Sequence, residues 1–279
     1  MNVLIADRLT PEAAEGLEAL GLSVEIKPDL TVDSLPEALP GVDVLVVHST
    51  PVTRRAIDAA DSLHLIVTTA LQHAHVDVDA ASDNAIIVAE CAEPSHDARA
   101  EFALAQLLRL DRTREASTGH GALPEALGLR DRCLGILGFS PSAERLASLA
   151  RGCGMTVRIA AAEVSNAVAS ELGIGHCSSP EELMARADYV SHHGDLLLTS
   201  ETLALLESPM VFVSVDRPTT LCFDALIEAC CERGARVALD VCATEEGDAL
   251  HQLTEHPNAL VTRGLAGATL QALDTLSRG

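Results

Sequence analysis

Residues 134–143, LGILGFSPSA, have the residue types of a loop that holds the pyrophosphate of a dinucleotide. In a GxGxxG loop the first glycine makes the turn between strand and helix, the second lets the pyrophosphate approach the backbone, and the third lets the helix pack on the strand. Gly138 keeps the first position and Ala143 is acceptable at the third, but Ser140 occupies the second. The pattern predicts a strand, a turn and a helix, and leaves open whether the turn binds a nucleotide or binds nothing.

Ser140, Pro141 and Ser142 would line the phosphate side of such a loop. The Ser140 side chain would take up space where the phosphate should lie, or its hydroxyl would donate a hydrogen bond to it. These sites also need an acidic residue about twenty residues on, at the end of the next strand, to bind a ribose hydroxyl. That position is Ala161, and Glu163 follows it, either within reach of the ribose or as a solvated surface glutamate. Both departures predict a dinucleotide site with fewer contacts than usual.

The charge of the chain excludes several classes of partner. Lys and Arg total 19 against 41 Asp and Glu, which gives a formal net charge of −22 and a pI near 4.7. A surface this acidic repels nucleic-acid phosphates and anionic lipids, so we expect no nucleic-acid and no membrane binding. The sequence has no apolar run long enough to span a bilayer and no basic N-terminal segment, so we expect a cytoplasmic protein. The acidity, with Lys27 as the only lysine, fits either a salt-rich, halophilic cytoplasm or a GC-rich coding bias.

Histidines and cysteines form no diagnostic metal site in the sequence. His73 and His75 are close in a predicted loop but have no carboxylate or cysteine at a ligand-like interval, so surface histidines are favoured over a metal site. The eight cysteines include no CxxC pair, and we expect buried, reduced thiols.

Short hydrophobic runs alternate with helical patterns along the whole chain, which is typical of parallel sheets covered by helices. Strands are predicted at 3–6, 23–26, 42–47, 63–68, 86–89, 133–137, 156–160, 189–192, 210–215, 236–241 and 259–262. Helices are predicted at 11–20, 32–39, 54–60, 76–82, 96–114, 142–151 and 180–186. Because the long helix at 96–114 separates two such sets, we predict an α/β fold of two Rossmann-like domains.

Several segments resemble, in order and spacing, the D-2-hydroxyacid dehydrogenase family of the phosphoglycerate-dehydrogenase type. They are VLIADRLTPEAAEGLEALGLSVEIKPDLT, LHLIVTTALQHAHVDVDAA, NAIIVAECAEPSHDARAEFALAQLLRL, GLRDRCLGILGFSPSAERLASLARGCGMTV, ADYVSHH, FVSVDRPTTLCFDALIEA, RVALDVCATEE and NALVTRGLAGAT. The resemblance covers almost the whole chain. It implies a flavodoxin-like substrate domain of residues 1–92 and 264–279, and an inserted NAD-binding domain of residues 93–263 that carries a long dimer helix. It also implies NAD as the cofactor and, as ligands, the 2-keto and D-2-hydroxy acids that the family interconverts.

The resemblance assigns roles to three residues of the second half. Arg217 matches the arginine that binds the substrate carboxylate, and a guanidinium fork suits that role, although a surface arginine is the alternative. Glu245 matches the glutamate that supports the catalytic histidine, against the alternative of a solvated acidic loop. Asp240 matches the residue that contacts the nicotinamide amide, against a strand-end aspartate satisfied by backbone.

The departures from the family pattern fall on the site. The catalytic histidine matches Gly264, and glycine cannot transfer a proton. The glycine-rich substrate loop is replaced by a segment that contains Ala70, Leu71, Gln72 and His73, which narrows the approach of a carboxylate. These changes, with a hydrophobic framework that is kept, indicate a fold retained while the chemistry was lost or changed.

Two hypotheses follow from this distribution. In the first, the chain is a homologue with lost or strongly reduced dehydrogenase activity and weak or absent NAD binding, acting as a binding protein or dimeric scaffold. In the second, it is an active NAD(H)-dependent oxidoreductase in which His73 or His193 replaces the lost acid. The apolar stretch 102–110 matches the family's dimer helix, so either version is expected to be a homodimer.

Overall fold

The computed structural model describes residues 1–7, 11–48, 50–68, 75–90, 95–112, 126–194, 196–215, 221–241 and 246–272. The chain forms two compact units, one of Met1–Pro94 with Thr269–Gly279 and one of Ser95–Ala268. The second unit, Ser95–Ala268, extends five residues beyond the C-terminal end of the predicted range 93–263, so Gly264 lies in this unit and not in the first. The predicted α/β fold with two parallel sheets is confirmed.

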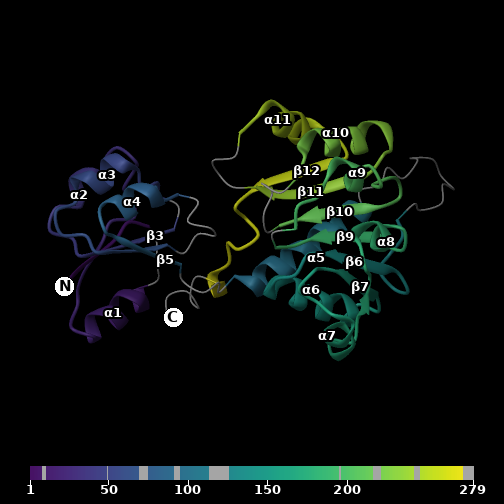
Figure 1. Cartoon of the computed structure of the whole chain (residues 1–279), viewed down its shortest axis with the longest axis horizontal. Coiled ribbons are helices and arrows are strands. Elements are labelled where there is room, and N and C mark those ends of the chain that lie inside the picture. The colour runs from purple at the N-terminus through teal and green to yellow at the C-terminus, as the bar shows by residue number, and fades with distance from the viewer. Residues whose placement is uncertain are drawn as a thin grey trace. The chain divides into compact units, whose positions relative to one another are not determined.

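The first unit is a five-stranded parallel sheet in the order β2-β1-β3-β4-β5 (Figure 1). This is the flavodoxin-like order, in which the chain changes direction between β1 and β3. Helix α1 covers one face, and α2, α3 and α4 cover the other. The elements are β1 Asn2–Ile5, α1 Pro11–Ala19, β2 Ser23–Ile26, α2 Leu35–Ala38, β3 Val44–Val47, α3 Arg54–Ala59, β4 Leu65–Thr68, α4 Val78–Asp83 and β5 Ile87–Glu90.

The second unit is a seven-stranded parallel sheet in the order β12-β11-β10-β9-β6-β7-β8. The order reverses between β6 and β9, which is the point where open α/β sheets bind ligands at the carboxyl ends of their strands. One apolar cluster joins α5, α6 and α7 to one face, and another joins α8, α9, α10 and α11 to the opposite face. The elements are α5 His96–Arg112, β6 Cys133–Leu137, α6 Pro141–Gly152, β7 Thr156–Ala160, α7 Asn166–Glu171, β8 Gly175–His176, α8 Pro180–Met184, β9 Tyr189–His192, α9 Ser200–Leu203, β10 Val211–Ser214, α10 Phe223–Glu232, β11 Arg236–Val241, α11 Asp248–Glu255 and β12 Ala259–Arg263.

Local sequence explains where these elements begin and where the predictions differ. Helix α2 begins at Leu35 rather than at residue 32, because the Ser34 hydroxyl accepts from the Thr31 amide and holds a turn there. The elements α7, β8, α9, α10 and α11 had no predicted range. Of these, α7, β8 and α9 are six residues or shorter and carry little periodic signal. Helices α10 and α11 were missed although each buries apolar residues at helical spacing, Leu226 with Cys230 and Leu250 with Leu253. No helix of the described residues is long and apolar enough to cross a membrane.

The described cysteines differ in part from the prediction of buried thiols. Cys177 and Cys230 are buried, whereas Cys153 and Cys231 are exposed at or after helix ends. Burial raises the pKa of the Cys230 thiol to about 12, with a smaller contribution from the neighbouring Cys231. Burial therefore holds for only some of these thiols, because the helix ends that carry the others face solvent.

Candidate functional site

The turn between β6 and α6 requires glycine. Gly138 has a φ of +83° and donates its N–H to the carbonyl of Ala160 at the end of β7, at 2.9 Å. A β-carbon on Gly138 would lie 1.9 Å from the backbone oxygen of His193, which follows β9. Gly194 makes the reciprocal approach, since its β-carbon would lie 2.6 Å from the backbone oxygen of Phe139. The loops after β6 and β9 therefore pack backbone to backbone at the point where the strand order reverses.

The amino terminus of α6 is capped by its own side chain. Ser140 is the N-cap residue, with extended backbone, and its Oγ accepts from the N–H of Ala143 at 3.2 Å. Pro141 comes next and has no N–H. A phosphate at this helix terminus would use the same amides. One of these donors is engaged by Ser140 and another is absent, so the terminus offers fewer donors than a glycine loop.

A chain of hydrogen bonds runs from this cap into the sheet. The hydroxyls of Ser140 and Ser142 are 2.9 Å apart, and the Ser142 hydroxyl is 3.0 Å from Nδ1 of His193. The opposite ring nitrogen, Nε2, is 2.8 Å from the hydroxyl of Ser191 on β9. Ser142, Ser191 and His193 are fully buried. Ser140, which stands at the second glycine position, is therefore linked through Ser142 to the histidine at the strand-order reversal.

The neighbouring histidine, His192, is also buried but has different partners. Its Nε2 lies 2.8 Å from the backbone oxygen of Leu196, and its Nδ1 lies 3.1 Å from the hydroxyl of Ser214. Its ring stacks on Phe212 with centroids 6.5 Å apart. Because a carbonyl can only accept, Nε2 of His192 carries the proton.

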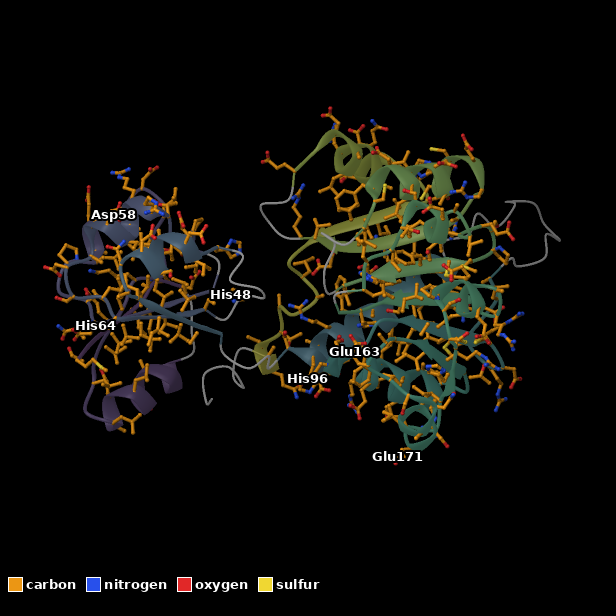
Figure 2. The ribbon with its side chains drawn as sticks, in the orientation of Figure 1. His48, Asp58, His64, His96, Glu163 and Glu171 are labelled. Carbon is orange, nitrogen blue, oxygen red and sulfur yellow. The ribbon has the colours of Figure 1, made fainter. Side chains whose placement is uncertain are left out.

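The carboxyl end of β7 lacks the acid expected for a ribose hydroxyl. The strand ends at Ala160, and Ala161 is half-buried. Glu163 lies on the loop that follows (Figure 2) and is exposed. The position that would accept from the ribose therefore carries a methyl group.

Asp240 is engaged by the protein itself. This carboxylate is 7% exposed, on β11. Its Oδ1 accepts from the hydroxyl of Thr262 at 2.6 Å and from the N–H of Leu265 at 3.0 Å, while its Oδ2 accepts from the N–H of Ala266 at 2.8 Å. Asp240 was expected either to contact the nicotinamide amide or to be a strand-end aspartate hydrogen-bonded by the backbone. These contacts are those of the second alternative. The carboxylate holds the turn that contains Gly264.

Gly264 is the residue that the sequence resemblance places at the histidine position. It follows β12, has a φ of +65° and donates its N–H to the carbonyl of Val241 at 3.0 Å. Among the residues that the structure describes, none apart from the chain neighbours lies within 4 Å of a β-carbon built there, although the positive φ would strain a side chain. Glycine supplies no proton-transfer group at this position.

In the first unit, Asp7, His48 and Thr50 gather after the carboxyl ends of β1 and β3, and none of the three was predicted as a site residue. Asp7 is buried and accepts from the amides of His48 at 2.7 Å and Thr50 at 3.2 Å. His48 is exposed at the end of β3 (Figure 2). Burial lowers the pKa of His75, and His48 lowers it further, whereas Asp7 opposes both. The signal in the sequence was Asp7 directly after the hydrophobic run 3–6.

Half of the predicted site residues lie outside the described residues. They are Arg217, Glu245, Ala70, Leu71, Gln72 and His73. The described loop residues Gly138, Ser140, Pro141 and Ser142 are brought together, and Asp240 is brought beside the turn of Gly264. Among the described residues, no group of three histidine, cysteine, aspartate or glutamate side chains could hold a metal ion.

Comparison with known proteins matches this arrangement to one family over nearly the whole chain. A model of the family described as D-isomer specific 2-hydroxyacid dehydrogenase, catalytic domain, matches residues 3–278. The chain is 31% identical over 293 residues to D-3-phosphoglycerate dehydrogenase of Mycobacterium tuberculosis, a match that covers 98% of this chain and 54% of the relative. It is 28% identical over 256 residues to D-3-phosphoglycerate dehydrogenase of Methanocaldococcus jannaschii, covering 86% and 49%. The chain thus spans about half the length of the curated relatives it matches.

Solved structures repeat the fold. The TT0316 protein from Thermus thermophilus is 26% identical, with a TM-score of 0.81 over 99% of this chain and 93% of that one. The apo-structure of D-lactate dehydrogenase from Escherichia coli is 20% identical, with a TM-score of 0.82 over 100% and 94%, and it shows the fold alone.

Proposed function

Since the chain belongs to the D-isomer specific 2-hydroxyacid dehydrogenase family, a family of NAD-dependent enzymes, we propose that it keeps the family's fold with lost or strongly reduced dehydrogenase activity and weak NAD binding. The observation that carries this proposal is Gly264. It matches the position of the family's histidine, and in the described part of the chain no group other than its chain neighbours lies within 4 Å of a β-carbon built there. Loss of a general acid/base removes about 10² to 10⁴ in rate.

The cofactor loop supports the second half of the proposal. Gly138 keeps the turn that a pyrophosphate needs, so the backbone fits the group in shape. Ser140 places a side chain at the second glycine position and caps the Ala143 amide, and Ala161 offers no acceptor to a ribose. Each lost contact costs about 1–3 kcal/mol. Two such losses, at about 1.4 kcal/mol per tenfold, would weaken a micromolar site to near millimolar.

The alternative is an active NAD(H)-dependent oxidoreductase with a substitute acid. His193 was one candidate, but it is fully buried and hydrogen-bonded through both ring nitrogens to Ser142 and Ser191. A group so enclosed does not reach a substrate without a rearrangement of the sheet. The other candidate, His73, lies outside the described residues.

Without dehydrogenase activity, the proposed role is that of a binding protein: the chain forms a homodimer and binds a small carboxylate ligand. Support for association comes from α5, where Phe102, Leu104 and Leu108 are each partly exposed. Apolar side chains of this size on one helix favour burial against a partner.

Titration calorimetry with NADH tests the proposal. We expect a dissociation constant near millimolar or no detectable heat. The double variant Ser140→Gly with Ala161→Asp restores both lost contacts and should bind NADH at least tenfold more tightly, while a single Glu163→Gln control should not change the affinity. Tight binding by the unmodified protein would refute the weak cofactor site. If the double variant binds NADH but still does not turn over 2-keto acids, Gly264→His is the next change to add.

A further inference from the structure

We propose that the outer edge of β2 is a docking site for an extended peptide that carries basic side chains at alternate positions. The peptide adds a strand to the sheet of the first unit and lays its basic side chains in a groove between β2 and α2. The inference goes beyond the proposed function, because it concerns a second surface that involves neither the cofactor loop nor Gly264.

The outer edge of β2 offers backbone groups to another strand. β2 is the last strand in the order of its sheet, and in the described part of the chain no strand pairs with its outer side. Lys27 donates its N–H to the carbonyl of Ile5 at 2.8 Å, on the β1 side. Because the direction alternates along a strand, the N–H and C=O groups of Val24 and Ile26 point away from β1. Such a row of outward groups is a template for strand addition.

The face of β2 beside α2 borders a groove. Glu25 is the register partner of Leu4, which packs in the apolar cluster under α2, so both side chains lie on this face of the sheet. The Glu25 side chain is 62% exposed, so no helix covers β2 here. A groove of about 370 Å³ lies between the strands β1 and β2 on one side and residues between Glu37 and Val42 on the other. It is large enough for side chains of an added strand.

The charges of this groove select the kind of partner. Nζ of Lys27, the only lysine of the chain, lies 2.9 Å from Oε1 of Glu25, so these two charges offset each other. Glu37 is exposed on the opposite wall. Two carboxylates and one ammonium leave the groove with one negative charge, on a chain whose net charge is −22. A basic side chain is the complement.

A second copy of the chain fits this edge poorly. Antiparallel pairing that joins Val24 of each copy to Ile26 of the other is the register that uses the outward groups of both residues. It places Glu25 directly opposite Glu25 of the second copy, and like charges that face each other across strands are destabilising. Both copies also carry a net charge of −22. The charges therefore favour a basic peptide over a second copy.

The geometry of an added strand predicts the pattern of the peptide. Alternate side chains of a strand point to opposite faces of the sheet. On the α2 face they would lie beside Glu25 and the groove, where Lys or Arg forms an opposite-charge pair across the strands. On the other face they would lie beside Val24 and Ile26, of which Ile26 is 39% exposed, so apolar side chains fit there. The expected peptide therefore alternates basic and apolar residues.

A random heptapeptide library displayed on phage and selected on the whole protein tests this pattern. We expect enriched peptides with Lys or Arg at every second position and apolar residues between them. An enriched peptide is then synthesised with a fluorescent label, and its affinity is measured by anisotropy. A selection that enriches no peptide, or that enriches peptides without this alternation, would overturn the proposal.

Amide hydrogen exchange followed by NMR locates the bound peptide. Exchange at the amides of Val24 and Ile26 should slow as the synthetic peptide saturates the protein, because these N–H groups gain an acceptor. The amide of Lys27 already donates to Ile5, so its exchange should stay unchanged. Unchanged exchange at Val24 and Ile26 would contradict strand addition, whatever the affinity of the peptide.

Two matched pairs of variants separate the edge and the charge from general effects. Ile26→Pro removes one outward N–H and keeps the bonds to β1, so it should weaken peptide binding at least about tenfold, whereas Ile26→Val should leave it unchanged. Glu37→Gln should weaken binding about two- to fivefold, whereas Glu18→Gln, exposed on α1 over the other face of the sheet, should not. Equal affinities within either pair would refute the site.

The variants and the exchange measurement fail independently. Circular dichroism shows whether Ile26→Pro is folded, and if it is not, the exchange at Val24 and Ile26 and the Glu37→Gln pair decide the proposal. The proposed function is tested separately by NADH binding and turnover, which use neither β2 nor α2. Tight NADH binding would overturn that function without changing the expected peptide binding.

Discussion

Replacing Gly138 by alanine should destabilise the second unit far more than the same change at another left-handed glycine. The β-carbon would lie 1.9 Å from the backbone oxygen of His193, about 1.5 Å short of the 3.4 Å at which ordinary contact begins. Gly128 of the same unit has a similar φ, +72° against +83°, but in the described part of the structure nothing lies within 4 Å of a β-carbon built there. An alanine at either position would have the strain of a left-handed backbone, but only at Gly138 would its β-carbon collide with another backbone atom.

The size of the difference follows from these geometries. A β-carbon in the left-handed region costs about 1–2 kcal/mol, which applies to both variants. At Gly138 the loop after β6 must also move away from the end of β9, and a forced shift of packed backbone costs about 1–3 kcal/mol more. We therefore expect losses of about 2–5 kcal/mol for Gly138→Ala and about 1–2 kcal/mol for Gly128→Ala.

Urea unfolding followed by far-ultraviolet circular dichroism is the suitable assay, since the chain has no tryptophan and one tyrosine. Transition midpoints are compared at a constant denaturant slope, which shows that the unfolded states are alike. Equal losses for the two variants would refute the backbone contact between the loops after β6 and β9.

Three further outcomes are expected. Asp240→Asn should lower the stability of the second unit by about 1–3 kcal/mol, because one of its three donors then faces an amide N–H, and it should leave NADH affinity unchanged; weaker NADH binding at unchanged stability would instead assign Asp240 to the cofactor. Light scattering should give the mass of a homodimer at micromolar concentration, with Phe102→Ser and Leu104→Ser weakening it; a monomer in both low and high salt would contradict the role of α5. The melting temperature should rise from dilute buffer to molar salt. With a net charge of −22 the acidic side chains repel one another, and molar salt screens this repulsion by reducing the Debye length to about 3 Å. A flat or falling curve would leave coding bias as the reason for the acidity.

The strands could be predicted where both faces of the sheet are buried, because such strands appear in the sequence as continuous hydrophobic runs. Cys133–Leu137 and Thr156–Ala160 were predicted with the bounds that the structure has, because their strands lie inside the sheet. Asn166–Glu171 and Gly175–His176 were missed, since a six-residue helix and a two-residue edge strand depend on neighbours more than on their own pattern. The boundary of the second unit could not be predicted from the sequence. It was predicted after residue 263 and lies after Ala268, because it depends on which contacts the segment after β12 makes in the folded chain.

The site was predictable where one residue type decides a backbone conformation. Gly138 could be placed at the turn because the loop pattern needs a glycine there, and the structure gives it a φ of +83°. The partners of the buried groups could not be predicted. Ser142 and His193 are 51 residues apart in the chain and meet only because β6 and β9 are neighbours in the sheet. For the same reason the three donors to Asp240 could not be predicted, since they lie on or after β12 and reach Asp240 only because β12 pairs with β11.

The rate of 2-keto acid reduction at saturating NADH decides whether the dehydrogenase chemistry is lost, because saturation removes weak binding as a cause of low activity. The purified protein is mixed with a panel of 2-keto acids and the oxidation of NADH is followed. Because Gly264 matches the histidine position and supplies no proton-transfer group, we expect for every member of the panel either no turnover or one at least about 10²-fold below the typical value of about 10 per second. A turnover of about one per second or faster, in the usual range of enzymes, would contradict it.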